Sequence, residues 1–282
     1  MNYLKIRYLL SLSFLILSLQ AQAQYYGVNP SVVGEWAVGL QLGSNYLRGD
    51  VPQVLPGYEI GVYAQNAFSR TMDLKIMIGG GISQGLGTEQ SGGFRNNTAL
   101  NGVQDSVYFY DSTQQIFHNY QTQHFSLSGA IKINLNRLLA PNSGDSWDLY
   151  LMAGLNFMLY ETRLNVYNES TFETYDYTQI TASDPVELRS QLNEILDGTY
   201  ETLAQQDVLN NTQIGNRTFR SCFLGGAGFR IRATDHFAIG LEGRYHFILD
   251  DLLDGQQWND DNSASIDNDH MITAGLTLDY IF

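Results

Sequence analysis

Long apolar runs are scarce in this sequence. The one stretch of this kind spans residues 8–19, which is short for a membrane-spanning helix of about 20 residues. After Gln24 no apolar run is long enough to cross a membrane as a helix. Because every backbone polar group needs a partner inside a bilayer, a membrane-spanning form of this chain must be a β-barrel.

Cysteine and basic side chains are scarce as well. The single Cys222 excludes an internal disulfide, and its place in a strand-like segment indicates a packed side chain rather than a nucleophile. Lys and Arg number 15 against 29 Asp and Glu, which gives a formal net charge of −14. Such acidity argues against nucleic acid as a partner, because nucleic-acid binding depends on neutralising phosphate charge.

The first residues have the features of an export signal. Lys5 and Arg7 precede the apolar stretch, and Ala21-Gln22-Ala23 follows it as a small-x-small cleavage site. We therefore expect residues 1–23 to be a signal peptide and residues 24–282 to form one β-barrel domain. An uncleaved anchor is the alternative, and the shortness of the apolar stretch argues against it.

What the chain has in abundance is alternation of apolar and polar residues. In the last segment, apolar side chains occupy every second position from Ile272 to Phe282, with Thr277 and Asp279 among the residues between them. A period of two is typical of a strand with one apolar and one polar face. The alternation occurs in eight segments, at residues 33–48, 57–69, 73–88, 121–137, 147–167, 218–233, 237–250 and 268–282.

The connectors between these segments alternate in length. The short turns are residues 69–72, 138–146 and 234–236, and the mostly longer loops are residues 49–56, 89–120, 168–217 and 251–267. Short periplasmic turns and long extracellular loops are typical of membrane barrels. The sequence therefore predicts an all-β fold, an eight-stranded antiparallel up-and-down transmembrane β-barrel with long extracellular loops.

The third long loop carries the signals of a short helix. Asp184 fits the N-cap, Pro185 the first helical position, and Glu187 the acid of a capping box. An apolar stripe follows at Leu188, Leu192, Ile195 and Leu196. We expect this helix to lie on the barrel mouth, and an element of a partner-binding groove is the alternative.

The apolar faces of the strands carry aromatic residues at both ends. One group is Trp36, Phe68, Trp147, Phe237, Tyr280 and Phe282, and the other is Tyr46, Phe125, Tyr245 and Phe247. Two such girdles are typical of a barrel whose apolar face meets lipid. The alternative is a water-soluble barrel or sandwich with that face inward, which gives no reason for aromatic residues at both strand ends.

Charged residues occupy the opposite, inward face. They are Glu35, Glu59, Lys75, Lys132, Asp148, Arg230, Glu242, Arg244 and Asp279, with His246 nearby. The interior of an eight-stranded barrel is just wide enough for side chains to fill it. Because unpaired buried charge is costly, we expect these acids and bases to neutralise one another and to plug the barrel. A proton or ion path through the same pairs is the alternative.

Signals for catalysis and for cofactors are weak. None of the five His residues belongs to an HExxH, GxSxG or Cys/His metal pattern, and we expect no cofactor and no metal site. His270 and Ser44 share the outer face near the extracellular rim, where a lipid-modifying enzyme needs a base and a nucleophile. A rim histidine in contact with lipid headgroups is the simpler interpretation.

The acidic loops at 169–216 and 250–269 are solvated loops or sites for divalent cations, without the spacing of an EF-hand.

Several blocks resemble the N-terminal barrel of OmpA-like outer-membrane proteins. They are GSNYLRGD (43–50), GYEIGVYAQNAFSRTMDLKIMIGGGISQGLG (57–87), NYQTQHFSLSGAIKINLN (119–136), EILDGTYET (194–202) and DDLLDGQQW (250–258). In that family the barrel often precedes a peptidoglycan-binding domain. Since no residue follows Phe282 here, the resemblance implies a barrel without that tether. The family's interior ion pairs correspond in character to Glu35, Lys75, Glu242 and Arg244. A closing strand that ends on an aromatic also resembles bacterial outer-membrane barrels, which implies an assembly signal at Leu278, Tyr280 and Phe282.

These features lead us to expect a non-enzymatic integral protein of the outer membrane of a Gram-negative bacterium, with a structural or surface-interaction role. The expected partners are outer-membrane lipids, lipopolysaccharide-type headgroups and the barrel assembly machinery. The sequence names no envelope protein as a partner. An accessory outer-membrane subunit of a secretion or export complex is one alternative. A lipid-modifying outer-membrane enzyme is another.

Overall fold

The structure is a computed structural model that describes residues 32–51, 54–97, 115–140, 146–205, 212–259, 261, 263–265 and 268–282. The expected signal peptide and most of the turn at 138–146 lie outside the described residues. Among the described residues, no helix is long and apolar enough to cross a membrane.

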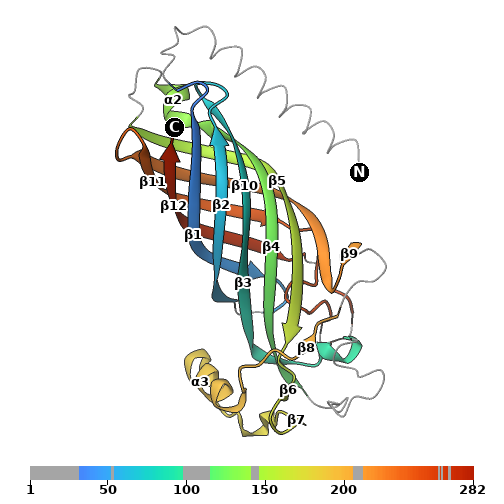
Figure 1. Ribbon diagram of the computed structural model, residues 1–282. Helices are drawn as coiled ribbons and strands as arrows, with labels where there is room; N and C mark the ends of the chain where they lie inside the picture. The colour runs from blue at the N-terminus through green and yellow to red at the C-terminus, as the bar shows by residue number, and fades with distance from the viewer. Residues whose placement is uncertain are drawn as a thin grey trace.

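Eight long antiparallel strands form a closed ring (Figure 1). They are β1 (Trp36–Arg48), β2 (Val54–Asn66), β3 (Met72–Ser91), β4 (Ile116–Asn134), β5 (Trp147–Leu164), β10 (Arg217–Arg232), β11 (Phe237–Phe247) and β12 (His270–Ile281). Each pairs with its neighbour along the chain, β5 pairs with β10, and β12 returns to β1. This closure gives each of the eight long strands a partner on both sides. The predicted eight-stranded up-and-down transmembrane barrel is confirmed, although β4 begins at Ile116 rather than at residue 121.

Successive side chains along each strand point in turn to the outer and the inner surface of the barrel. In β11, Phe237, Ile239 and Leu241 are exposed on the outside, whereas Glu242 and Arg244 are buried inside. Gly39 on β1 marks a place where the inside is crowded. A Cβ atom added there would lie 2.4 Å from the ring of Tyr63 and 2.7 Å from an oxygen of Asp279, so only glycine fits.

The outside of the barrel is an apolar band with aromatic rings near both ends. Leu241 in the middle of the band is 60 % exposed, as a residue that faces lipid should be. At one end, the Tyr280 ring lies 5.3 Å from that of Phe237 and 5.2 Å from that of Phe282. At the other end, the Tyr245 and Phe247 rings lie 4.5 Å apart. Both girdles therefore lie where the sequence places them.

One end of the barrel, the turn end, carries the short connections and α2 (Leu135–Leu139). The sequence prediction of strand to residue 137 is wrong here, because a helical turn begins at Leu135. The Asn136 side chain stabilises this turn. Its Nδ2 donates to the Trp147 carbonyl at 2.7 Å, and its Oδ1 accepts from the Leu149 N–H at 3.1 Å. The side chain thereby joins α2 to the start of β5.

The opposite end, the loop end, carries a lobe built from residues 165–205, which we call the loop lobe (Figure 1). It contains the hairpin of β6 (Tyr167–Asn168) and β7 (Glu173–Thr174), then η2 (Tyr177–Gln179), α3 (Pro185–Ile195) and β8 (Thr202–Leu203). Nearby are η1 (Gly93–Asn96) and β9 (Thr212–Ile214), the latter paired with β10. The predicted loop helix is confirmed as α3, whose N-cap Asp184 accepts from the Val186 N–H at 3.0 Å and the Glu187 N–H at 3.2 Å.

The largest hydrophobic core of the described chain lies at the loop end and not in the middle of the barrel. Leu192 of α3 is fully buried there with Leu47, Tyr120, Ile248 and Leu253. These side chains come from strand ends, from α3 and from the loop between β11 and β12. We call residues 248–259 of that loop the mouth loop. Apolar burial therefore fixes the loop lobe and the mouth loop onto the barrel opening.

Candidate functional site

The centre of the barrel holds an ion pair that crosses the lumen. Lys75 of β3 lies 2.7 Å and 2.9 Å from the two carboxylate oxygens of Glu242 on β11. Tyr150 of β5 donates its hydroxyl to the same carboxylate at 2.8 Å. These three strands are not neighbours in the ring, so the contacts connect its opposite walls. The Lys75 ammonium also lies 3.9 Å from the centre of the Tyr63 ring.

Next to this pair, toward the loop end, Arg244 holds two acids. Its guanidinium donates to the Glu59 carboxylate on β2, and its Nε lies 3.7 Å from Glu242. His124 Nε2 is 3.9 Å from the other Glu59 oxygen. Arg244 is 3 % exposed and Glu59 5 %, so their charges have little water to stabilise them. Arg244 is thus the link between the acids of two strands, β2 and β11, that are not neighbours in the ring.

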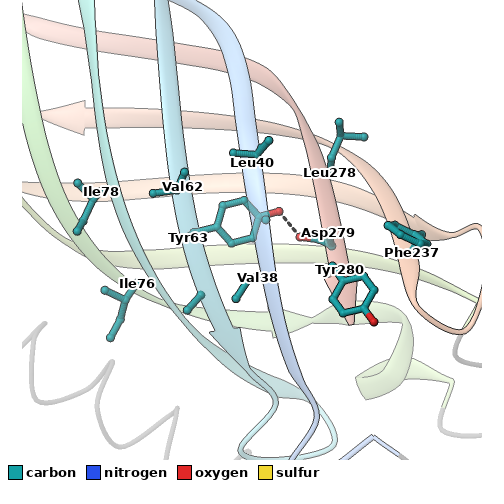
Figure 2. A pocket seen from close by; sticks show the side chains of 12 residues that line it. Val38, Leu40, Val62, Tyr63, Ile76, Ile78, Phe237, Leu278, Asp279 and Tyr280 are labelled. Atoms are coloured by element: carbon teal, nitrogen blue, oxygen red, sulfur yellow. Dashed lines mark hydrogen bonds between the residues drawn. The ribbon is translucent and has the colours of Figure 1, made fainter. Parts of the chain in front are cut away.

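Toward the turn end, Arg230 joins a second group of acids. Its Nε lies 2.8 Å from Asp279 on β12, and its Nη1 lies 3.5 Å from Asp148 on β5. Arg137 of α2 approaches Asp148 to 2.7 Å. The Tyr63 hydroxyl donates to Asp279, and Figure 2 shows this bond behind the outer side chains of β1 and β12. Arg230 and Arg137 therefore neutralise Asp279 and Asp148 on the turn-end side of the Lys75–Glu242 pair.

Lys132 on β4 reaches its nearest acid through an amide. Its ammonium donates to Gln65 Oε1 at 2.8 Å, and Gln65 Nε2 donates to Asp73 at 2.8 Å. The ammonium also lies 3.8 Å from the centre of the Tyr150 ring. Asn134 donates to the other Asp73 oxygen at 3.3 Å. Among the described residues, no carboxylate contacts the Lys132 ammonium directly. The Gln65 amide and the Tyr150 ring contact this buried cation instead.

Eight of the nine charged residues singled out in the sequence lie buried in the lumen. They are Glu59, Lys75, Lys132, Asp148, Arg230, Glu242, Arg244 and Asp279. Glu35 differs from expectation. It precedes β1, is only partly buried, and pairs with Arg232 at 2.6 Å at the turn end. The reason is its position, because β1 begins at Trp36 and Glu35 lies beyond the barrel wall.

Several lumen residues were not predicted from the sequence, among them Tyr63, Asp73, Arg137 and Tyr150. Asp73 was open to prediction, since it lies two residues from Lys75 on the same strand and so shares its face. Tyr63 and Tyr150 lie at inward positions too, but aromatic residues are expected on the lipid face as well. Arg137 had no usable signal, because the helical turn of α2 interrupts the period of two.

The mouth loop closes over the loop end of the lumen. Leu252 and Leu253 are buried, and the Leu253 carbonyl accepts hydrogen bonds from the hydroxyls of Thr122 on β4 and Thr162 on β5, the latter at 2.8 Å. Below them, Asp250 pairs with Arg220 of β10 at 2.8 Å. The loop is therefore bound to the opening by polar contacts as well as by apolar burial.

Two buried carboxyl groups meet beneath this loop. Asp254 accepts from the Val51 N–H at 3.0 Å and from the Gln256 N–H at 2.9 Å, while Asp269 accepts from the Leu253 N–H at 2.7 Å. A Cβ atom placed on Gly49 would lie 1.8 Å from Asp269 Oδ1 and 2.5 Å from Asp254 Oδ2. The two oxygens therefore both lie over Gly49, and a side chain at this position would force the carboxylates to move.

Burial raises the pKa of both carboxyls of this pair. It raises the pKa of Asp254 from the usual 3.8 to about 7, although the Gln256 and Val51 amides act in the opposite direction. Burial, and then the charge of Asp254, raise the pKa of Asp269 well above its usual value. Asp50 and Asp251 add negative charge from the same side. Two facing carboxyls share one proton more readily than they carry two charges.

An apolar groove lies on the outer face of β1, β2, β3 and β12, with a volume of about 690 Å³ (Figure 2). The labelled outer side chains in Figure 2 include Leu40, Val62 and Leu278, all from the lipid-facing band. The groove is therefore part of the surface that faces acyl chains. Its polar floor residues, Tyr63 and Asp279, satisfy each other.

The candidate base and nucleophile of a lipid-modifying enzyme do not meet. On β1 and β12, Ser44 pairs with Ala274, whereas His270 pairs with Arg48. The two residues are therefore about 14 Å apart along the sheet, at about 3.4 Å a residue. The His270 ring instead lies 5.4 Å from that of Tyr245 in the girdle of the loop end. Among the described residues, no group of three His, Cys, Asp or Glu side chains is placed to hold a metal ion.

No protein-family model and no curated protein matches this sequence. Solved structures of small barrels do align with it. The attachment invasion locus protein Ail of Yersinia pestis covers 89% of this chain and 99% of its own, at 8% identity and a TM-score of 0.38. Neisserial surface protein A covers 88% and 98%, at 9% identity and a TM-score of 0.40. The outer membrane protein OprG of Pseudomonas aeruginosa covers 89% and 96%, at 8% identity and a TM-score of 0.40. Values this low carry no argument about function.

The first prediction concerns Arg244. Replacing it by Ala leaves Glu59 and Glu242 in the lumen without their shared cation, and should lower the free energy of unfolding by about 3–5 kcal/mol. Urea unfolding of the refolded barrel in lipid vesicles, followed by tryptophan fluorescence, measures the change.

The matched control is Arg163→Ala, which breaks a partly exposed pair with Glu161 at 2.7 Å. It should cost about 1 kcal/mol or less. The double variant Arg244→Ala/Glu59→Gln should recover part of the loss, because it removes the Glu59 charge that Arg244→Ala leaves without its cation, whereas Glu242 keeps Lys75. A loss for Arg244→Ala no larger than that for Arg163→Ala would contradict the role of Arg244 as a link.

The second prediction concerns the proton on the Asp254–Asp269 pair. Because the pKa of Asp254 is raised in the folded protein, the stabilisation from that proton is fully present below the usual value of 3.8 and is lost as the pH rises toward about 7. Protection of the Leu253 and Gln256 amides against hydrogen exchange, corrected for the intrinsic pH effect, should fall over that range.

Asp269→Asn is the matched variant, since its amide can keep the bond from the Leu253 N–H and donate to Asp254 at any pH. It should hold the mouth loop equally well at pH 5 and pH 8, conditions chosen on either side of the transition. Equal pH dependence in this variant and in the unmodified protein would show that the pair does not control the loop.

Proposed function

We propose that this protein is a non-enzymatic, integral outer-membrane barrel with a structural or surface-interaction role, and that its interior is closed by paired charges. The observation that carries the proposal is the contact of Lys75 with Glu242 across the lumen, with Tyr150 on the same carboxylate. These side chains come from three separate walls of the ring and occupy its centre. Arg230 and Arg244 fill the levels on either side.

The loop lobe supports the surface-interaction part of the proposal. Its buried residues Leu188 and Leu192 belong to the same core as the strand ends, so apolar burial anchors the lobe to the barrel. Its acids point outward, for example Glu187 and Glu194 on α3. A rigid, hydrophilic lobe on a membrane barrel presents a defined surface at low entropic cost on binding.

The apolar band and the girdles support an outer-membrane location. In this proposal, the partners are the outer-membrane lipids, lipopolysaccharide-type headgroups and the barrel assembly machinery. Leu278, Tyr280 and Phe282 then form the assembly signal, on the lipid-facing side of the closing strand. Membership of the OmpA-like family rests on the sequence blocks alone. The proposal contains no catalytic step, and the separation of Ser44 from His270 supports that part of it.

The third prediction concerns conduction. The purified barrel in planar lipid bilayers should show no stable conductance, because side chains occupy the lumen at several levels. The control replaces residues 251–265 with a short Gly-Ser linker. This variant should stay closed, since the charge network lies below the mouth loop. Large, reproducible open-channel steps in the unmodified protein would refute the closed interior, and steps in the linker variant alone would place the seal in the mouth loop.

The fourth prediction concerns orientation. In a Cys222→Ser background, Glu194→Cys on α3 and Asp235→Cys at the turn end place one exposed thiol at each end of the barrel. A membrane-impermeant maleimide added to intact cells should label only Glu194→Cys, and it should label both variants after lysis. Labelling of Asp235→Cys alone in intact cells would invert the proposed orientation and remove the loop lobe from the cell surface.

A further inference from the structure

The hairpin of β6 and β7 in the loop lobe presents an aromatic ring to solvent (Figure 1). We call residues 167–174 the lobe hairpin. Phe172 lies in its turn and is 57 % exposed. The backbone φ of Phe172 is 59°, in the left-handed region, and no other non-glycine residue in the described part of the chain has a positive φ. A bulky side chain in this region is a rare outlier, because its Cβ atom crowds the following carbonyl oxygen.

Polar contacts fix the turn that carries Phe172. The Phe172 N–H donates to the Asn168 carbonyl at 2.8 Å, and the Asn168 side-chain oxygen accepts from the Thr171 N–H at 3.1 Å. The Glu169 N–H donates to the Asp197 carboxylate at 2.8 Å, which ties the turn to the segment that follows α3. The surrounding lobe therefore holds residue 172 in the left-handed conformation.

Phenylalanine is an unfavourable residue for this position. Glycine and asparagine adopt the left-handed conformation far more readily and are the usual residues in it. The Phe172 ring stacks on that of Tyr167, with 6.5 Å between the ring centres and 24° between the ring planes, yet more than half of Phe172 stays exposed. Little apolar burial therefore offsets the strained backbone. Strain at an exposed aromatic residue indicates that the ring serves a contact outside the fold.

The surface that surrounds the ring is acidic. Glu169 begins the turn and Glu173 follows it, and both are exposed. Residues 164–188 include five acids and no Lys or Arg. The face of an aromatic ring attracts a cation, and carboxylates beside the ring add to this attraction. The lobe hairpin is therefore complementary to Lys or Arg side chains, whereas its charge repels an anionic partner.

We propose that the lobe hairpin is a docking surface for a basic protein segment, with an Arg or Lys side chain of the partner over the Phe172 ring and beside Glu169 and Glu173. Aromatic rings are enriched at the centres of protein–protein interfaces. Because the lobe already holds the turn, the ring meets its partner with little loss of conformational freedom. The proposal rests on the surface-interaction role and specifies its surface and its class of partner. Its test uses purified protein, so it can fail while the closed interior and the orientation hold.

The experiment measures the binding of a fluorescent oligoarginine peptide to the barrel in nanodiscs of zwitterionic phospholipid. Physiological ionic strength screens long-range attraction to the acidic protein. We expect saturable binding. Phe172→Asn keeps the charge of the hairpin but removes the ring, and should weaken binding about fivefold, whereas Phe172→Tyr should retain most of the affinity. The double variant Glu169→Gln/Glu173→Gln should weaken binding as well.

The same Phe172→Asn variant separates contact from stability. Asparagine tolerates the left-handed backbone, so hydrogen exchange of the hairpin amides should be slower in this variant than in the unmodified protein. A loss of binding then cannot result from a disordered hairpin. Glu194→Gln on α3 is the matched control for charge, because it removes one exposed acid of the loop lobe outside the hairpin. It should leave the affinity unchanged.

Four outcomes would overturn the proposal. Faster exchange of the hairpin amides in Phe172→Asn would show that the ring stabilises the fold. Absence of saturable binding, or equal affinity of Phe172→Asn and the unmodified protein, would remove the ring from any contact with a basic segment. Weakening by Glu194→Gln as large as that by Glu169→Gln/Glu173→Gln would indicate general attraction to an acidic lobe. Binding of neutral dextran that depends on Phe172, without binding of oligoarginine, would assign the ring to a carbohydrate.

Discussion

Charge compensation inside a narrow lumen is the constraint on which the rest of this barrel depends. The ring closes all its strand edges and turns its apolar face outward, so inward side chains have only one another as partners. Lys75 and Glu242 meet this demand across the lumen, and Arg244 and Arg230 extend it in both directions. Unpaired buried charge is costly. A shift in strand register, or a change of one of these residues, would therefore leave a buried charge without its partner.

This arrangement reverses the usual division between core and surface. In the barrel, polar residues are central and Leu241 faces outward at 60 % exposure, whereas the loop end carries a conventional apolar core with Leu192 and Tyr120. The two regions are stabilised by different physics. Hydrogen bonds between strands and paired charges hold the barrel, and apolar burial holds the loop lobe and the mouth loop onto its opening. A rigid lobe on a closed barrel follows from this division.

Regular alternation made most of the barrel predictable from the sequence. It gave the number of strands, their order and the two faces, and the capping residues Asp184 and Pro185 gave α3. Prediction failed where the period of two ends. Glu35 lies one residue before β1 and faces the rim, and Arg137 enters the lumen from a helical turn. The Asp254–Asp269 pair was beyond prediction for another reason, since it joins two loop residues through a contact over Gly49 that no local pattern encodes.

The buried carboxyl groups of the lumen and those at the mouth are neutralised in different ways. In the lumen, Glu59 and Asp279 have arginines as fixed partners, so their compensation is part of the fold. At the mouth, burial raises the pKa of both Asp254 and Asp269, so the two facing carboxyls share a proton more readily than they carry two charges. A proton exchanges with the surroundings, whereas an arginine side chain does not. Charge compensation in the lumen is therefore fixed by the fold, whereas at the Asp254–Asp269 pair it depends on the pH.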